Sequence, residues 1–309
     1  MTTSSHALVA PVSAPATKVA PLVIVSPVRD EAKLIQQTLD SVVAQTVRPQ
    51  EWVIVDDGST DNTVEIVEAF AQRYPFIHLV RHENRGFRKL GGGVVAAFKF
   101  GLTKIRSPEF AFVAKLDGDM SFGPRYLEKM FERFDHNPKL AAVSGKVFRP
   151  ENGELIEEAI IDEHVAGQFK LYRWDAYQDI GGFVEEVLWD GIDVHTARMK
   201  GWDTCSFMDP DALLYHHRLM GSSDKNVLRG RLRWGRGLYF MGYHPLYTIA
   251  SGLFRMREKP FIIGGLLIIV GYFKAALQGV PRYDNPEFRQ YLRRWQMQQL
   301  KARLFGSRP

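Results

Sequence analysis

The residues best suited to chemistry in this 309-residue chain are two carboxylates separated by one glycine, Asp117-Gly118-Asp119. They end the apolar run 110–116, which has the composition of a buried strand. Side chains two positions apart in an extended chain point the same way, and Gly118 permits a tight turn. Converging carboxylates are hard ligands for a divalent cation, which usually also binds substrate phosphates. The alternative interpretation is an ordinary polar turn, so the surrounding elements must decide.

A second acidic cluster, Asp56-Asp57-Gly58-Ser59-Thr60-Asp61, follows the apolar run 52–55. Around it, short apolar runs alternate with segments of helical periodicity, which predicts a parallel sheet with crossover helices. Ligands of such sheets bind beyond the carboxyl ends of the strands, where both acidic clusters fall. Asp30 and Asp61 are the expected N-caps of the first two helices. The expected strands are 21–27, 52–55, 78–80, 110–116 and 140–145, and the expected helices are 34–43, 62–73, 94–102, a segment from Pro124, and 163–177.

The loop 83–93 is basic and rich in glycine, and it leads into an expected helix, which favours phosphate binding. It matches neither GxxxxGK[ST] nor GxGxxG, which argues against a P-loop NTPase and a dinucleotide dehydrogenase.

The composition, with 45% hydrophobic and 24% charged residues, is that of a globular protein. The net charge of +5 suits anionic partners. The single cysteine, Cys205, excludes an internal disulfide and fits a reducing cytoplasm. Residues 1–20 have no signal-peptide pattern and are expected to form a disordered tail.

The order and spacing of three motifs resemble family 2 glycosyltransferases of the GT-A fold. These are the Pro-x-x-Asp-Glu pattern at 27–31, the acidic turn 55–61, and Asp117-Gly118-Asp119. The resemblance covers roughly residues 21–236. It implies an α/β, Rossmann-like, mainly parallel sheet flanked by helices.

For the donor, the resemblance implies that the acidic turn reads the nucleotide, with Asp57 the first choice and Asp56 the second. Pro27 and Glu31 are then expected along the base and ribose. Asp61 is better explained as a helix N-cap.

Asp117 and Asp119 resemble the DxD pair of the family, which implies contact with the ribose and with Mn²⁺ or Mg²⁺ on the donor diphosphate. His216 is the expected further metal ligand, in preference to His217, because imidazole suits a transition metal. The alternative is a pair of solvated or hydrogen-bonded histidines in a loop.

The stretch 187–202 resembles the Glu-Asp element that supplies the catalytic base, and counting back from Lys200-Gly-Trp202 selects Asp190. Trp189 stands where the family usually has Glu, which leaves Asp193 as a rival. Asp193 could instead stabilise the first turn of a helix. An inverting displacement needs one carboxylate to take the proton of the acceptor hydroxyl.

Acceptor contacts are expected from Gly182, Phe183 and Trp189. Gly182 also suits a helix C-cap. Arg233 and Trp234 partly match the Gln-x-x-Arg-Trp element of polysaccharide synthases, which implies a diphosphate clamp and stacking on a sugar ring. The alternative is a basic amphipathic helix on a solvated face or on membrane phosphates.

The C-terminal part, 237–309, differs from the rest of the chain. Its run 261–273 is the most apolar in the sequence but is short of the roughly 20 residues that span a bilayer. A re-entrant or interfacial helix, or a hydrophobic hairpin with 237–256, is expected, and the alternative is a buried core helix. The chain is thus divided into a tail (1–20), a GT-A domain (21–236) and a helical membrane-associating segment (237–309).

These observations predict a metal-dependent inverting enzyme that moves a sugar from a nucleotide sugar to a lipid-linked or polysaccharide acceptor. The expected donor is a UDP sugar. It is expected at the cytoplasmic face of the cell membrane, as a peripheral or monotopic protein. A homo-oligomer is compatible with the sequence, and a nucleic-acid partner is not expected. The alternatives are a processive polysaccharide synthase, a non-catalytic nucleotide- or sugar-binding subunit, and a nucleotidyltransferase.

Overall fold

The computed structural model describes residues 18–82, 92–151, 154–158, 161–218 and 227–306. Two sheets contain the strands β1 (Lys18–Val28), β2 (Val47–Asp56), β3 (Ile77–Arg81), β4 (Phe112–Leu116), β5 (Met120–Phe122), β6 (Leu140–Gly145), β7 (Val147–Glu151), β8 (Glu154–Glu157), β9 (Phe169–Arg173), β10 (Asp203–Phe207) and β11 (Leu214–His216). The helices are α1 (Ile35–Val43), α2 (Thr63–Arg73), α3 (Gly92–Leu102), α4 (Tyr126–His136), α5 (Trp174–Asp179), α6 (Trp189–Met199), the 3₁₀ turn η1 (Pro210–Ala212), α7 (Val227–Met241), α8 (Pro245–Arg255), α9 (Ile263–Leu277) and α10 (Pro286–Phe305).

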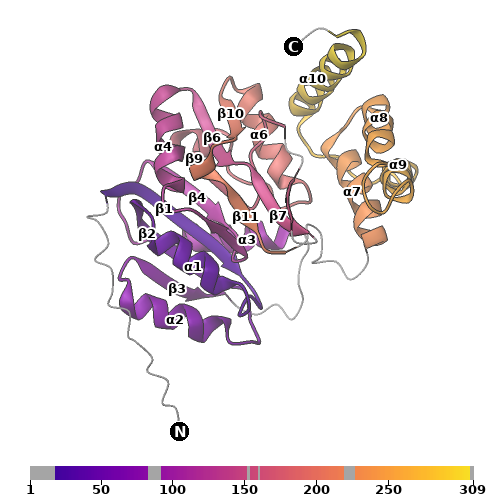
Figure 1. The fold of residues 1–309 in the computed structure, drawn as a ribbon. Helices are drawn as coiled ribbons and strands as arrows, with labels where there is room; N and C mark the ends of the chain where they lie inside the picture. The colour runs from indigo at the N-terminus through magenta and orange to yellow at the C-terminus, as the bar shows by residue number, and fades with distance from the viewer. Residues whose placement is uncertain (1–17, 83–91, 152–153, 159–160, 219–226, 307–309) are drawn as a thin grey trace.

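The larger sheet has seven strands in the order β10-β6-β9-β4-β1-β2-β3 (Figure 1). All its neighbouring pairs are parallel except those of β9, which runs antiparallel between β4 and β6. The expected α/β fold with a mainly parallel sheet is therefore confirmed. The predicted helix over 163–177 is wrong for residues 169–173, which form β9 in the middle of the sheet.

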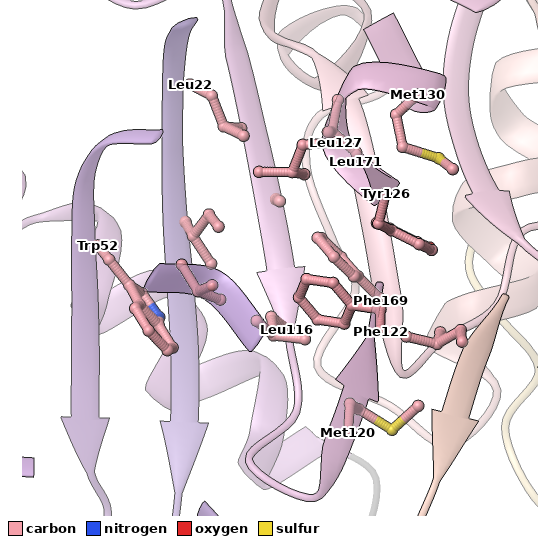
Figure 2. Close-up of a cluster of buried hydrophobic side chains, with 14 of the residues drawn as sticks. Leu22, Trp52, Leu116, Met120, Phe122, Tyr126, Leu127, Met130, Phe169 and Leu171 are labelled. Atoms are coloured by element: carbon pink, nitrogen blue, oxygen red, sulfur yellow. The ribbon is translucent and has the colours of Figure 1, made fainter. Parts of the chain in front are cut away.

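Both faces of this sheet are covered by helices. Along β1, Leu22 and Ile24 face a core shared with α1, α2 and α4, while Val23 and Val25 face a core shared with α3, α5 and α6. The first core also contains Trp52 and a group of aromatic side chains that Figure 2 shows packed around Phe169. The alternation explains why the strands are apolar runs, because residues on both faces are buried.

A smaller sheet, in the order β5-β11-β7-β8, continues from the carboxyl end of β4. It joins segments distant in sequence, since β5 pairs with β11 so that Met120 lies opposite His216. The hydroxyl of Thr38 in α1 donates to the Met120 carbonyl at 2.7 Å, which fixes β5 to the first helix. This sheet brings the end of β11 to the Asp117-Gly118-Asp119 turn.

Several expected boundaries are corrected by the structure. Residues 18–20 belong to β1 rather than to a tail, and residues 1–17 lie outside the described residues, as does most of the loop 83–93. Asp30 does not cap α1: it has a φ of 55°, and its carboxylate accepts the Thr60 N–H at 2.8 Å. Asp61 does support the start of α2, because it accepts the Thr63 N–H at 3.1 Å.

The predicted boundary after residue 236 falls inside α7, which packs along α9. The helical C-terminal unit therefore begins with α7 rather than at residue 237. None of the helices in the described part of the chain combines the length and hydropathy that crossing a bilayer requires.

The packing of α10 on α6 predicts an acid-sensitive stability. His195 of α6 is buried, with its ring centroid 4.7 Å from that of Trp295 in α10. Burial, together with the positive charges of His164, Arg198 and Lys170, lowers the pKa of His195 to about 3. The unfolded chain binds a proton near pH 6.5 that the folded chain does not, so the free energy of unfolding falls as the pH drops below 6.5.

Between pH 7.5 and 5.5, we expect this residue alone to cost about 1 kcal/mol of stability. Urea unfolding of the wild type and of His195→Leu at both pH values measures this loss in the free energy of unfolding. The variant should lose about 1 kcal/mol less than the wild type. Equal losses would show that His195 is protonated in the folded chain.

Candidate functional site

The turn after β4 is held against the start of α1. The Asp117 N–H donates to the Gln168 carbonyl at 2.9 Å. A Cβ on Gly118 would lie 3.0 Å from Val28 and 3.3 Å from Cγ of Glu31, so glycine allows this close approach. The turn therefore places Asp117 and Asp119 next to Glu31, as the sequence predicted for a shared site.

Asp119 is buried and faces two cationic groups. Its Oδ2 lies 3.6 Å from Nε2 of His216 and 3.5 Å from Nε of Arg218. Its Oδ1 is buried and has no hydrogen-bond partner among the described residues. Burial opposes ionisation of Asp119, but the two cationic neighbours lower its pKa below the usual value. A carboxylate with one oxygen unsatisfied is thus ready to bind a further cation.

His216 is held between two carboxylates. Its Nδ1 lies 3.0 Å from Oε1 of Glu158, and its Nε2 faces Asp119. Burial alone would lower its pKa, but these carboxylates raise the pKa to about 9. A metal ion binds the neutral imidazole, so it would compete with a proton for His216. The other histidine, His217, accepts or donates a 2.7 Å hydrogen bond with the Ser121 hydroxyl.

The residues present fit a divalent cation that is shared with a phosphate ligand. Within the described ranges, no set of three or more His, Cys, Asp or Glu side chains is arranged to hold a metal ion. Magnesium sites at phosphates commonly use one or two carboxylates and complete the shell with phosphate oxygens and water. Asp119, whose Oδ1 has no hydrogen-bond partner among the described residues, meets that requirement, and His216 stays the expected further ligand.

Replacing Asp119 with Asn is expected to weaken Mn²⁺ binding in the presence of a nucleoside diphosphate by about 10- to 100-fold, because a charged ligand is lost. Isothermal titration measures the affinity without any catalytic turnover. Asp211→Asn is the matched control, since Asp211 pairs with Arg125 and should leave the affinity unchanged. Equal Mn²⁺ affinity in both variants would exclude Asp119 as a ligand.

In the acidic turn after β2, Asp56 and Asp57 have different surroundings. Asp56 is buried, and its Oδ1 accepts the Ser59 N–H at 2.9 Å, so it holds the turn together. Asp57 is half-buried, with Oδ1 2.9 Å from Nδ1 of His82. Pro27 lies opposite Val55 in the pairing of β1 with β2, at the same end of the sheet. The geometry supports Asp57 over Asp56 as the group that reads a nucleotide.

Glu31 and Arg218 form an ion pair at the metal side of the site. Burial raises the pKa of Glu31 to about 7, against the opposing effect of Arg218. The sequence analysis did not select Arg218 as a site residue. Its position two residues after the end of β11 could have indicated it, because ligands bind beyond strand ends. Its guanidinium contacts both Glu31 and Asp119, and a guanidinium at this position is a group that can bind phosphate oxygens.

A buried lysine connects the two ends of the site. Lys115 of β4 donates to Oδ1 of Asp117 at 2.5 Å and to the Gly167 carbonyl at 2.8 Å. A Cβ on Gly167 would lie 2.9 Å from Oδ2 of Asp190, so the Asp190 carboxylate packs directly against this glycine. The structure therefore brings Asp190 into the same site as Asp117, through Lys115 and Gly167.

Asp190 and Asp193 are now distinguished by burial. Asp193 is 2% exposed, and both its oxygens accept from Lys170 of β9 at 2.7 Å, with the Tyr172 hydroxyl at 2.8 Å. Both Asp193 oxygens are thus engaged in the core, which favours Asp190 over Asp193 as the candidate base. Lys170 also donates to the Asp190 backbone carbonyl at 2.7 Å, which fixes the first turn of α6. The Asp190 side chain remains only partly buried.

The three predicted acceptor residues Gly182, Phe183 and Trp189 have packing or capping roles in the structure. Phe183 is 2% exposed and packs against Trp189, with ring centroids 4.7 Å apart. Trp189 is itself buried, with the Lys115 and Lys170 ammonium groups within 5.3 Å of its ring. Gly182 has a φ of 74°, and its N–H donates to the Tyr177 carbonyl, as in a helix C-cap. These packing and capping roles do not exclude acceptor contact, which stays a prediction for Gly182, Phe183 and Trp189.

Arg233 and Trp234 lie on α7, within the C-terminal helical unit. The Trp234 ring is covered by guanidinium groups, with Arg255 at 4.3 Å and Arg231 at 5.4 Å from its centroid. It also packs beside the apolar cluster of α7 and α9. Sugar stacking by Trp234 and phosphate binding by Arg233 stay predictions.

Comparison with known proteins gives a consistent result. Residues 23–184, slightly more than half of the chain, match the profile of Glycosyl transferase family 2. A poly-beta-1,6-N-acetyl-D-glucosamine synthase of Staphylococcus epidermidis is 25% identical over 228 residues, which are 67% of this chain and 52% of that protein. The chain therefore spans about half the length of the curated relatives it matches.

Solved structures share the fold. TarS of S. aureus, residues 1–349 in complex with UDP-GlcNAc, has a TM-score of 0.53 at 17% identity, covering 88% of this chain and 78% of that one. A mannosyltransferase from Pyrobaculum calidifontis, in complex with GDP-Man and Mn²⁺, has a TM-score of 0.52 at 16% identity, covering 94% and 90%.

Proposed function

The chain belongs to glycosyl transferase family 2, and on that premise we propose that it transfers a sugar, with inversion, from a nucleotide sugar to a hydroxyl of a surface-polysaccharide acceptor. The observation that carries the proposal is the convergence of Asp119, Asp117 and Asp190 in one site, joined by Lys115 and Gly167. A site of this kind has carboxylates for a diphosphate-bound cation at one end and a base at the other.

The donor is held by its nucleotide and its diphosphate. Asp57 accepts hydrogen bonds from the base or ribose, and Asp117 from the ribose. Arg218 binds the diphosphate oxygens through its guanidinium, which is already directed to this end of the site by Glu31. Asp119, with His216 as a further ligand, would hold Mn²⁺ or Mg²⁺. When bound, that cation offsets the negative charge that develops on the departing diphosphate.

The acceptor is activated by Asp190. Its carboxylate takes the proton of the acceptor hydroxyl while that oxygen forms a bond to C1 of the sugar. The bond from C1 to the diphosphate breaks on the opposite side, and the nucleoside diphosphate leaves with that electron pair. One base suffices, because a single displacement has no covalent enzyme intermediate.

A UDP sugar is the proposed donor, supported by the UDP-GlcNAc bound to the structural relative TarS. The mannosyltransferase relative binds GDP-Man, so both donor classes enter the test. Purified protein with Mn²⁺ is given UDP and GDP sugars together with a lipid-linked or polysaccharide acceptor, and free nucleoside diphosphate is measured. Release of UDP that needs acceptor supports the proposal. Release of inorganic diphosphate, or binding of UDP without turnover, would reject it in favour of a nucleotidyltransferase or a binding subunit.

A processive polysaccharide synthase is the second candidate, because the S. epidermidis relative is a synthase of a polymer. The length of the product on a gel separates the two. A ladder that extends while substrate is still in excess favours the processive enzyme, and a single added sugar favours the first proposal.

A further inference from the structure

Helix α9 has three glycines and an alanine on its buried face, and it leaves several large apolar residues exposed. Its buried face consists of Gly264, Gly265, Ile268, Gly271, Tyr272 and Ala275. Its exposed stripe has helical spacing and consists of Ile263, Leu266, Val270, Phe273 and Leu277, of which Leu277 is 90% exposed. A helix in water normally buries the large apolar side chains instead.

The inward face allows neighbouring backbones to touch. A Cβ on Gly271 would lie 2.2 Å from the Leu232 carbonyl oxygen of α7, and a Cβ on Gly265 would lie 2.1 Å from the Gly252 carbonyl oxygen of α8. Association through small residues at close range is the usual packing of helices in lipid, where apolar side chains can remain outside.

Further exposed large apolar side chains lie on α8, which packs against α9, and on the segment before α9. We call this set the apolar face; it consists of Leu246, Leu253, Phe254, Phe261, Ile262, Ile263, Leu266, Val270, Phe273 and Leu277. Ile262 is 64% exposed and has a φ of 59°, which β-branched residues rarely adopt. Figure 1 shows α7, α8 and α9 gathered beside the sheets. None of the residues of the apolar face belongs to the two cores of the larger sheet.

Basic side chains border the apolar face. Arg257, Lys259 and Lys274 are exposed within or next to it. Acidic residues are sparse in the same stretch, where Glu258 is paired with Arg255. Helix α9 has 15 residues, fewer than the roughly 20 that a bilayer span needs. A short apolar helix with a basic border suits the boundary between lipid headgroups and acyl chains.

We propose that the apolar face docks onto an anionic phospholipid bilayer, with α8 and α9 lying in the plane of the interface. The basic border attracts the anionic headgroups, and the large side chains enter the acyl region. The expected partner of the apolar face is lipid rather than a second copy of the chain. An interface between two identical copies would place their basic borders near each other, and like charges repel. The proposal does not depend on catalytic activity. It would place the site at the membrane, where lipid-linked acceptors lie.

Flotation of the full chain with vesicles tests this proposal. Binding to vesicles of phosphatidylcholine with about one third phosphatidylglycerol should exceed binding to pure phosphatidylcholine by at least about tenfold, and should weaken with salt. Leu266→Glu with Phe273→Glu should reduce binding by at least about tenfold.

The matched control is Leu155→Glu with Met208→Glu, which adds the same charges at residues of similar exposure on the sheet domain. It should bind vesicles like the wild type, and circular dichroism confirms that both variants are folded. Equal loss in the two double variants would overturn the proposal, as would a wild type that stays with the unbound fraction. A wild-type dimer that Leu266→Glu with Phe273→Glu converts to monomer, without vesicle binding, would assign the face to a second copy.

Discussion

Replacing Asp190 with Asn is expected to lower kcat by about 10³-fold, because removal of a general base commonly costs 10²- to 10⁴-fold. The amide cannot accept the proton of the acceptor hydroxyl, while its size and shape are almost unchanged. The KM for the nucleotide sugar should stay within about twofold, since the donor contacts lie at Asp57, Asp117 and Arg218. Steady-state release of nucleoside diphosphate, measured at saturating acceptor, gives both parameters.

Asp175→Asn is the control for this change. Asp175 follows Trp174 in the first turn of α5, as Asp190 follows Trp189 in the first turn of α6. It is exposed and lies outside the site, so any loss that comes only from removing a charge at a helix start appears in both variants. If Asp190→Asn retains wild-type kcat, Asp190 is not the base. The carboxylates at the Asp117-Gly118-Asp119 turn must then be tested in its place.

The sequence was sufficient to predict those strands and helices that neighbouring residues specify. The alternation of apolar runs and amphipathic segments predicted β1, β2, β3, β4 and the helices between them, because a crossover unit is contiguous in the chain. The same pattern placed Asp57 and the Asp117 turn at strand ends. The metal, the donor and the base were predicted by resemblance, and the roles of Asp119 and Asp190 stay predictions.

The parts that were missed depend on contacts between distant segments. The sequence of β9 is aromatic and basic and does not by itself predict a buried strand. It forms a central strand because β4 and β6 pair with its two edges. Lys170 gives no local sign that Asp193, 23 residues later, will neutralise it in the core. A lysine within an apolar strand, as at Lys115, was the available signal, since a charge there needs a buried partner. Phe183 and Trp189 pack against each other, and their contact with an acceptor stays a prediction.

Replacing Lys170 with Met is expected to reduce the free energy of unfolding by about 3–5 kcal/mol. Lys170 is fully buried on β9, and Asp193 keeps only the Tyr172 hydroxyl and a backbone N–H when the ammonium group is removed. A buried carboxylate without its cation is costly because no water replaces the lost partner. Equilibrium unfolding in urea, followed by tryptophan fluorescence, measures the loss.

The double variant Lys170→Met with Asp193→Asn separates the two roles of this lysine. The amide of Asn carries no charge and still accepts from the Tyr172 hydroxyl, so most of the lost stability should return. The kcat should not return, because the Asp190 carbonyl has lost the donor that fixes the first turn of α6. Recovery of both quantities would show that Lys170 only supports the core. Recovery of stability alone would establish that it also positions the base, and that β9 links the fold of the sheet to the chemistry at its edge.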